Sequence, residues 1–301
     1  MRTMLSNLIV EAALNDPKVI VLSGDHGYAL FDDIRRRAPL QFVNAGIMEQ
    51  GIIGIAAGLA KVGRRPIVYG LSAFIPVRVL EQIKLDVCYS GLPILFLGDG
   101  AGLVYSTLGA SHQCGEDIAC LRPIPKIQIF SPADANELKS CMREALSFEG
   151  PSYLRIGKSD RPVVTPPDQK STEAYFTTRA SAPKKKLFVA TGSMLSIAHT
   201  LAVKTGHSCL SIPKIKPLPP SALELISGFD QIDIFEEHSR YGGLTSALID
   251  ALVEKSAAVP KFHVHSLKSK FSETCGSYQH ALSEHGISDQ QLMAHYEVSA
   301  P

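Results

Sequence analysis

Residues 41–70 read QFVNAGIMEQ GIIGIAAGLA KVGRRPIVYG, and this stretch decides the fold class. A strand candidate at Gln41–Asn44 ends at a glycine turn, helical periodicity fills Gln50–Lys61, and a second apolar strand candidate covers Pro66–Tyr69. This order of strand, helix and strand is typical of an α/β fold with a parallel sheet.

The same alternation of strand and helix continues on both sides of this stretch. The further strand candidates are Val19–Leu22, Pro93–Leu97, Lys126–Phe130 and Ser152–Ile156, and the further helix candidates are Met1–Asn15, Phe74–Tyr89 and Asp134–Phe148. Strand candidates such as ILFL are apolar throughout, which favours parallel strands that are buried on both faces. We therefore expect an α/β protein whose first domain, residues 1–160, is doubly wound.

The composition changes between residues 157 and 186, which are rich in proline, serine, threonine, lysine and aspartate. This change predicts a linker over residues 161–185. Beyond it the alternation resumes, which predicts a second, smaller α/β domain over residues 186–301. Its expected elements are strands at Leu187–Ala190, Ser208–Ile212, Gln231–Phe235 and Phe262–His265, with helices from Met194 and Leu244.

The composition excludes several classes of function. Hydrophobic residues make up 45% of the 301 residues, charged residues make up 20%, and the net charge of +1 gives no reason to expect nucleic acid or a membrane as a partner. The six cysteines form no CxxC pair, which is typical of a reduced, cytoplasmic protein. Because the ten histidines show no metal-ligand spacing, we expect no metal site in this chain.

Two short motifs suggest sites that the surrounding sequence does not support. Gly98-Asp99-Gly100 follows a strand candidate, but the asparagine that would complete a diphosphate and metal motif roughly 25–30 residues later is absent, so we expect a strand-to-loop turn. The sequence has neither a Walker loop nor a Rossmann motif in the right context, and Ser193 does not lie in a GxSxG motif.

Glu49 stands in the first turn of the helix predicted after the glycine turn. An acidic residue there stabilises the helix dipole, which is a sufficient structural explanation on its own. Its neighbours are unusual, however, because Ile47, Met48 and Ile52 surround the carboxylate with apolar atoms. Small residues at Gly51, Gly54 and residues 56–58 also allow close packing of this helix.

The stretch NAGIMEQGIIGIAAGLAKVGRRPIVYG resembles the pyrimidine-binding segment of transketolases and 1-deoxyxylulose-5-phosphate synthases. In that family the glutamate hydrogen-bonds the aminopyrimidine ring of thiamine diphosphate and so promotes ionisation of the thiazolium carbon. The resemblance implies this catalytic role for Glu49 and a place for Ile47 beside the cofactor. SAFIPVRVLEQIKLDV, residues 72–87, resembles the family's next segment and implies that Phe74 and Arg78 also contact the cofactor. Arg78 is equally explained as a solvated helix charge.

Three later segments extend the resemblance. The segment ASHQ, residues 110–113, is similar to a family motif whose histidine contacts substrate near the reacting carbon, which implies a catalytic and substrate-binding role for His112. GPSYLRIGKSDRP, residues 150–162, places Lys158 where relatives bind substrate phosphate, with Arg155 nearby. ATGSM, IKPL and EEHSRYGGL resemble the family's C-terminal domain, in which we assign His238 no catalytic role.

A full-length transketolase has a preceding diphosphate-binding domain, which carries the Mg²⁺ ligands, and this chain starts at the pyrimidine-binding domain. The resemblance therefore implies a separately encoded N-terminal subunit that supplies the diphosphate and Mg²⁺ contacts. We expect a heterotetramer of two copies of each subunit (α₂β₂), inactive without that partner, that acts on small sugars.

Two departures from the family concern the acceptor sugar. Leu108 stands where relatives have an acidic residue that contacts a substrate hydroxyl, and Gly100 stands where they carry a basic residue for phosphate. Losing a charge-assisted phosphate contact costs on the order of 1.5–3 kcal/mol. We therefore expect an acceptor other than an ordinary sugar phosphate, such as a keto or deoxy sugar or a nucleotide-linked sugar.

Three alternatives stay open. The chain resembles 1-deoxyxylulose-5-phosphate synthases closely, although those enzymes usually carry both halves in one chain. The β subunit of a 2-oxoacid dehydrogenase decarboxylase shares the domain order and the glutamate. A non-catalytic α/β binding or regulatory subunit is the alternative from another class, and the joint presence of Glu49, Phe74 and His112 argues against it.

Overall fold

Seven strands form the first sheet of this computed structural model, which describes residues 1–181 and 185–297. Their order across the sheet is β10-β5-β6-β4-β3-β1-β2. The bounds are β1 (Val19–Ser23), β2 (Phe42–Asn44), β3 (Arg65–Leu71), β4 (Leu95–Asp99), β5 (Gln128–Phe130), β6 (Ser152–Ile156) and β10 (Lys214–Lys216). All neighbours pair in parallel except β10, which runs antiparallel to β5.

Helices cover both faces of the first sheet. They are α1 (Arg2–Asn15), α2 (Asp32–Arg37), α3 (Glu49–Lys61), α4 (Leu80–Gln82), α5 (Asp117–Leu121) and α6 (Ala135–Ser147). In β1, Val19 and Val21 pack with α1 and α6 in one apolar cluster, whereas Ile20 and Leu22 pack with α3 in another. Successive side chains of a strand point to opposite faces, so apolar residues at every position bury both faces. The expected doubly wound α/β class is confirmed.

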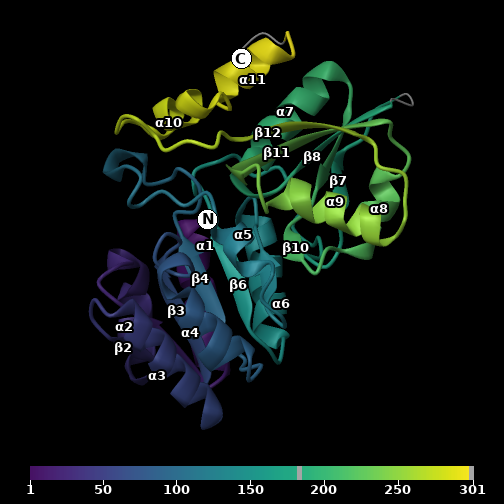
Figure 1. Ribbon diagram of the computed structural model, residues 1–301. Coiled ribbons are helices and arrows are strands. Elements are labelled where there is room, and N and C mark those ends of the chain that lie inside the picture. The colour runs from purple at the N-terminus through teal and green to yellow at the C-terminus, as the bar shows by residue number, and fades with distance from the viewer. Residues whose placement is uncertain (182–184, 298–301) are drawn as a thin grey trace.

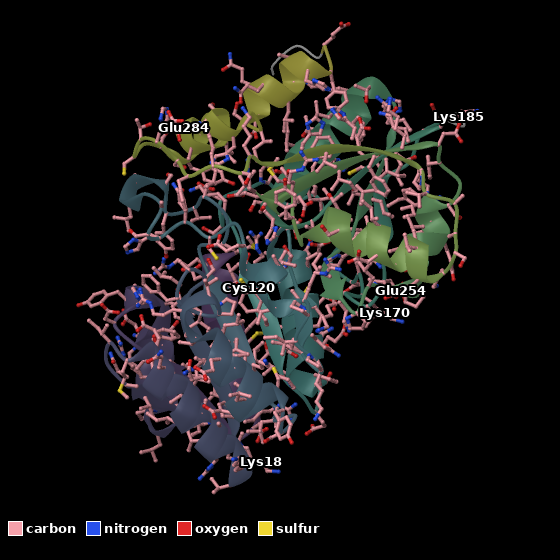
Figure 2. The ribbon with its side chains drawn as sticks, viewed as in Figure 1. Lys18, Cys120, Lys170, Lys185, Glu254 and Glu284 are labelled. Carbon is pink, nitrogen blue, oxygen red and sulfur yellow. The ribbon has the colours of Figure 1, made fainter. Side chains whose placement is uncertain are left out.

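The second sheet has the order β12-β11-β8-β9-β7. Its strands are β7 (Tyr175–Thr178), β8 (Lys186–Ala190), β9 (Ser208–Ser211), β11 (Gln231–Ser239) and β12 (Lys261–Leu267), and its helices are α7 (Leu195–Thr205), α8 (Pro220–Ile226), α9 (Leu244–Glu254), α10 (Tyr278–His285) and α11 (Asp289–His295). Figure 1 shows the two domains in contact, with α10 and α11 at the end of the second domain. Cys120 on α5 lies near the junction of the domains (Figure 2), and all six cysteines are free thiols.

Three local features differ from the sequence expectations. The expected linker, residues 161–185, contains β7, which runs antiparallel to β9 in the second sheet. Lys214–Lys216 forms β10, which adds to the first sheet although it lies within residues 186–301. The expected helix Phe74–Tyr89 is broken into a short 3₁₀ turn, the single turn α4 and a wider π-helical segment at Ile83–Cys88. In the described ranges, every helix is too short or too polar to cross a membrane.

Candidate active site

A small pocket, here called the Glu49 pocket, lies where β1, β2 and β3 end. Its lining includes Gly24 and His26 after β1, Glu49 at the start of α3, and Phe74 after β3. Ligands of open parallel sheets bind at the carboxyl ends of the strands, so the fold itself places this pocket. Gly46, at φ +77°, makes the turn between β2 and α3 and donates its N–H to Asn44 Oδ1 at 2.9 Å.

Glu49 forms an ion pair at this pocket. Its Oε1 accepts a hydrogen bond from Arg78 Nη1 at 2.8 Å. The Glu49 side chain is 14% exposed, whereas that of Arg78 is 48% exposed. The Arg78 guanidinium carbon also lies 3.9 Å from the centroid of the Phe74 ring. Arg78 therefore covers both the carboxylate and one aromatic ring of the pocket.

The Phe74 ring links the pocket to two imidazoles. His112 meets it edge-on, with 5.4 Å between ring centroids, and His26 lies 5.5 Å from it. His112 Nδ1 lies 2.9 Å from Ser111 Oγ. The structure thus brings together Glu49, Phe74, Arg78 and His112, which the sequence analysis predicted as site residues.

His26 is a residue at this site that the sequence analysis missed. It lies 3.3 Å from the carboxylate of Asp25, and both residues line the pocket. The available signal was the segment Gly24-Asp25-His26-Gly27 directly after β1, because polar residues at the carboxyl end of a parallel strand face the ligand-binding edge.

Apolar side chains lie exposed beside the pocket. Ile47 lines the pocket but is 75% exposed. Three neighbouring apolar side chains are also exposed: Val43 on β2, Met48 in the turn after it, and Ile55 on α3. We call these four residues the Ile47 surface. Contiguous exposed apolar side chains are typical of a surface that contacts another protein or a ligand.

Lys158 and Arg155 do not join the Glu49 pocket. Lys158 lines a separate pocket with Tyr105 and Asp99, and its Nζ lies 3.0 Å from the carboxylate of Asp160. Arg155 is 2% exposed, and its Nε donates to both carboxylate oxygens of Asp117. The guanidinium of Arg155 is enclosed between the two domains, so the structure does not bring it to the Glu49 pocket, and its contact with substrate stays a prediction.

The buried surroundings of Arg155 join the two domains. Its Nη2 donates to the carbonyl of Glu237, and Glu237 Oε1 accepts the Leu103 N–H at 2.7 Å. His238 donates from Nδ1 to the Ser239 carbonyl, and burial lowers the pKa of this imidazole to about 4.

The two departures from the family occupy distinct environments. Leu108 is half-exposed. Gly100 has φ +73°, and a Cβ there would lie 1.9 Å from the Tyr105 ring. Tyr105 donates to Asp99 Oδ2 at 3.0 Å, so its ring is held in the space that a side chain at position 100 would need. The Gly98-Asp99-Gly100 motif is thus a strand-to-loop turn, as expected.

The family described as "Transketolase, pyrimidine binding domain" matches residues 1–164. One subunit of an apulose-4-phosphate transketolase from Phocaeicola vulgatus is 29% identical, over 86% of this chain and 85% of that protein. A 6-deoxy-6-sulfo-D-fructose transketolase subunit from a Clostridium species is 28% identical, over 84% and 81%. A 1-deoxy-D-xylulose-5-phosphate synthase from Lawsonia intracellularis is 33% identical, over 82% of this chain but 40% of its own length.

A solved structure described as a split-gene transketolase in an inactive β4 tetramer superposes with a TM-score of 0.87 and 29% identity, over 98% of this chain and 96% of that chain. The transketolase of Campylobacter jejuni, at 15% identity and a TM-score of 0.75, shares the fold over 98% of this chain and 46% of its own. The family match covers more than half of the 301 residues, and the relatives most similar in length are subunits of split transketolases. This chain therefore belongs to the transketolase family.

Proposed function

We propose that this chain is the C-terminal subunit of a two-component transketolase that uses thiamine diphosphate. The enzyme transfers a two-carbon ketol unit from a ketose donor to an aldehyde or keto-sugar acceptor. The observation that carries the proposal is that the Glu49 carboxylate and the Phe74 ring line one pocket and that the His112 imidazole meets the Phe74 ring edge-on. These residues are separated by up to 63 positions in the chain, and the ends of parallel strands bring them together.

The residues of the Glu49 pocket fit the pyrimidine half of the cofactor. Glu49 offers a mostly buried carboxylate that can share a proton with a ring nitrogen, and Phe74 offers a flat apolar face for stacking. Ile47 adds an apolar contact at the rim of the pocket. Thiamine diphosphate, when bound, supplies the nucleophilic carbon that takes up the two-carbon unit.

Arg78 contacts both residues that we propose to hold the pyrimidine. Its guanidinium, itself planar, pairs with Glu49 and lies over Phe74. We propose that Arg78 shields the Glu49 carboxylate when the pyrimidine is absent and moves to the side of the pocket when it binds. The half-exposed side chain has room for this movement.

His112 and Lys158 would act on the sugar. The imidazole of His112 offers ring nitrogens that can hydrogen-bond a sugar oxygen, and it lies against the Phe74 ring of the Glu49 pocket. Lys158 would bind an anionic group of the donor or acceptor once Asp160 releases its ammonium group. Arg155 has no part in this proposal because it is buried.

A partner subunit would complete the site. The Ile47 surface is exposed beside the pocket, and the relative at 29% identity with solved coordinates is described as inactive when it contains β subunits alone. We propose that a separately encoded diphosphate-binding subunit covers this surface, supplies the Mg²⁺ ligands and forms an α₂β₂ heterotetramer in the cytoplasm.

The acceptor would differ from an ordinary sugar phosphate. Tyr105 fills the space beside Gly100, so no basic side chain for phosphate fits there, and Leu108 offers an apolar contact in place of a carboxylate. A site without a hydrogen-bonding group distinguishes poorly between a sugar that carries a hydroxyl at that position and one that lacks it. A keto, deoxy or nucleotide-linked sugar satisfies these conditions. The proposal is supported by two relatives whose names refer to apulose 4-phosphate and to a 6-deoxy-6-sulfo-D-fructose.

The test is ketol transfer by the chain co-expressed with the diphosphate-binding subunit of the same genome, in thiamine diphosphate and Mg²⁺. We expect turnover from the pair and none from this chain alone. Glu49→Gln in the assembled pair should lower kcat by roughly 10²–10⁴-fold, because the carboxylate holds the proton during the reaction. Glu81→Gln, on the exposed side of α4, is the matched control and should keep full activity. Full turnover by the single chain, or an unchanged Glu49→Gln enzyme, would contradict the proposal.

A further inference from the structure

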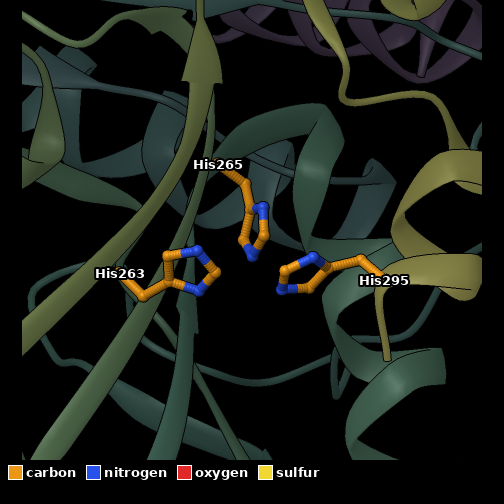
Figure 3. Close-up of side chains that lie close together, drawn as sticks. All are labelled: His263, His265 and His295. Carbon is orange, nitrogen blue, oxygen red and sulfur yellow. The ribbon is translucent and has the colours of Figure 1, made fainter. Parts of the chain in front are cut away.

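Three histidines converge on the second domain, far from the Glu49 pocket in sequence. His263 and His265 stand two residues apart on β12, so their side chains lie on one face of this edge strand. His295 is the last residue of α11. Figure 3 shows the three imidazoles turned toward one another across the space between strand and helix. One nitrogen from each ring lies within 4.8 Å of the other two.

A tyrosine and an aspartate orient the middle imidazole. Tyr296 donates its hydroxyl proton to Asp233 Oδ2 at 2.6 Å, because an ionised carboxylate only accepts. The same hydroxyl oxygen lies 2.8 Å from His265 Nε2 and must therefore accept the Nε2 proton. In neutral His265 the lone pair is then on Nδ1. The Asp233 carboxylate is fully buried and lies 3.8 Å from His263 Nδ1, which is beyond hydrogen-bond distance.

Hydrogen bonds between the rings do not explain why the three imidazoles lie so close together. Among the described hydrogen bonds, none joins one of these three rings to another, although the ring centroids are 4.6–5.3 Å apart. His263 is 42% exposed at its side chain and His295 is exposed, so the space between the rings is open to ions from solvent.

We propose that His263, His265 and His295 bind one first-row transition metal ion of the Zn²⁺ type, which fastens α11 to the edge strand β12. Imidazole nitrogens suit this class of ion, and a carboxylate or hydroxyl behind the ligating ring is the usual outer contact. Tetrahedral Zn²⁺ with bonds of about 2.0–2.1 Å separates its ligand nitrogens by roughly 3.4 Å. Small rotations of the two exposed rings close the present distances to that value, and water completes the coordination.

This site is distinct from the Mg²⁺ that a thiamine-diphosphate enzyme needs. Mg²⁺ prefers oxygen ligands and octahedral geometry, and three imidazoles provide neither. The sequence analysis expected no metal site because the ten histidines show no HExxH or other metal-ligand spacing along the chain. The third ligand, His295, stands 30 residues later and reaches the pair through the packing of α11. Metal binding at these histidines does not depend on the proposed ketol transfer.

The test is calorimetric titration of the untagged full-length chain, stripped with EDTA and dialysed, with Zn²⁺ alone. We expect saturable binding of one ion per chain, no binding of Mg²⁺ at the same concentrations, and a Co²⁺ complex with the strong visible absorption of tetrahedral coordination. A chain that binds no Zn²⁺ saturably would overturn the proposal.

Variants locate the ion. His263→Gln and His295→Gln should each weaken Zn²⁺ binding by at least about tenfold, and Tyr296→Phe, which keeps the ring but loses the orienting hydroxyl, by about 10-fold as well. His280→Gln on α10, whose ring contacts Thr274 and Glu284, is the matched control and should bind as the wild type does. The two exposed histidines were chosen because their replacement leaves the stacking of His265 on Phe235 intact. Wild-type affinity in the double variant His263→Gln, His295→Gln would place the ion elsewhere and refute the site.

Discussion

Two arginine–carboxylate pairs, with nearly equal N–O distances, lie in opposite surroundings. Arg78 and Glu49 are 2.8 Å apart at the mouth of the Glu49 pocket, with side chains 48% and 14% exposed. Arg155 and Asp117 are 2.9 Å apart between the domains, with side chains 2% and 0% exposed. The sequence analysis placed both arginines at the active site. The two pairs differ in burial, which a sequence motif does not record: the Arg78 pair is accessible, whereas the Arg155 pair is enclosed at the domain junction, where Arg155 also donates to the Glu237 carbonyl.

The two pairs should differ in energy as well as in accessibility. An exposed ion pair contributes about 0–1 kcal/mol to stability, because water and salt screen it. Breaking a buried pair leaves an uncompensated charge in a medium that solvates it poorly. Asp117 also accepts a hydrogen bond from Tyr153 at 2.8 Å, so the buried pair belongs to a network. The contrast therefore predicts a weak, removable contact at the pocket and a strong, permanent one at the domain junction.

Arg155→Met should give the largest effect. The change leaves the Asp117 carboxylate buried without its cation and removes the bond to the Glu237 carbonyl. We expect the free energy of unfolding of the full chain to fall by about 3–5 kcal/mol. Urea denaturation followed by circular dichroism measures this loss.

A double variant tests the reason for that loss. Asp117→Leu combined with Arg155→Met removes both charges and should recover part of the stability, because apolar groups of similar volume often replace a buried pair at little cost. A double variant as unstable as the sum of both single variants would show that the pair does not act as a unit. Arg155→Met with wild-type stability would remove the contrast between the two pairs.

The second prediction concerns pH at the same junction. Burial lowers the pKa of His238 from 6.5 to about 4. The negative charge of Asp117 raises this pKa, and the positive charge of Arg155 lowers it further. Between pH 6.5 and pH 4 the unfolded chain therefore binds a proton that the folded chain does not, so stability falls as the pH falls. The contribution of this residue is on the order of 2–3 kcal/mol over that window.

His238→Gln should remove this contribution. Urea unfolding of both proteins at pH 7 and pH 4 in EDTA should show a smaller loss of stability for the variant. His265 also has a lowered pKa, and it contributes equally to the pH dependence of stability in both proteins. Other titrating groups are common to the two chains, so the difference isolates position 238. Equal slopes would show that folding does not lower the pKa of His238.

Local sequence predicted the parallel strands of the first sheet, and it did so most clearly for β1, β3, β4 and β6, whose apolar runs are largely buried on both faces. Ser152–Ile156 was predicted with both bounds correct, as β6. The strands that were missed, β7 and β10, are short, partly polar and antiparallel to their partners. Lys214–Lys216 forms a strand because β5 offers it an edge after the domains meet. Such a strand is specified by tertiary pairing, which periodicity along the chain does not record.

Sequence motifs predicted which residues lie near one another at the candidate site. They did not predict which of those residues are buried away from it. Glu49, Phe74 and His112 converge because they follow three parallel strands. Glu49 comes after β2, Phe74 after β3, and His112 lies in the loop after β4. Arg155 stands in a matching segment, but its position on the central strand β6 points it into the junction with Asp117. The spacing of His263 and His265 places both side chains on one face of β12. His295 reaches them only through the packing of α11, which the sequence does not reveal.

Arg78→Ala should give the smallest change in stability and so completes the comparison of the two pairs. Because the Arg78 side chain is 48% exposed, we expect the free energy of unfolding to change by less than about 1 kcal/mol, and less still at high salt. The same change frees the Glu49 carboxylate and the face of Phe74 that the guanidinium covers. Thiamine diphosphate should then bind the assembled enzyme at least as tightly as before, measured by quenching of protein fluorescence. A loss of stability comparable to that of Arg155→Met would show that exposure does not separate the pairs. Cofactor affinity reduced more than tenfold, at unchanged stability, would mean that Arg78 contacts the cofactor directly instead of shielding Glu49 until the cofactor arrives.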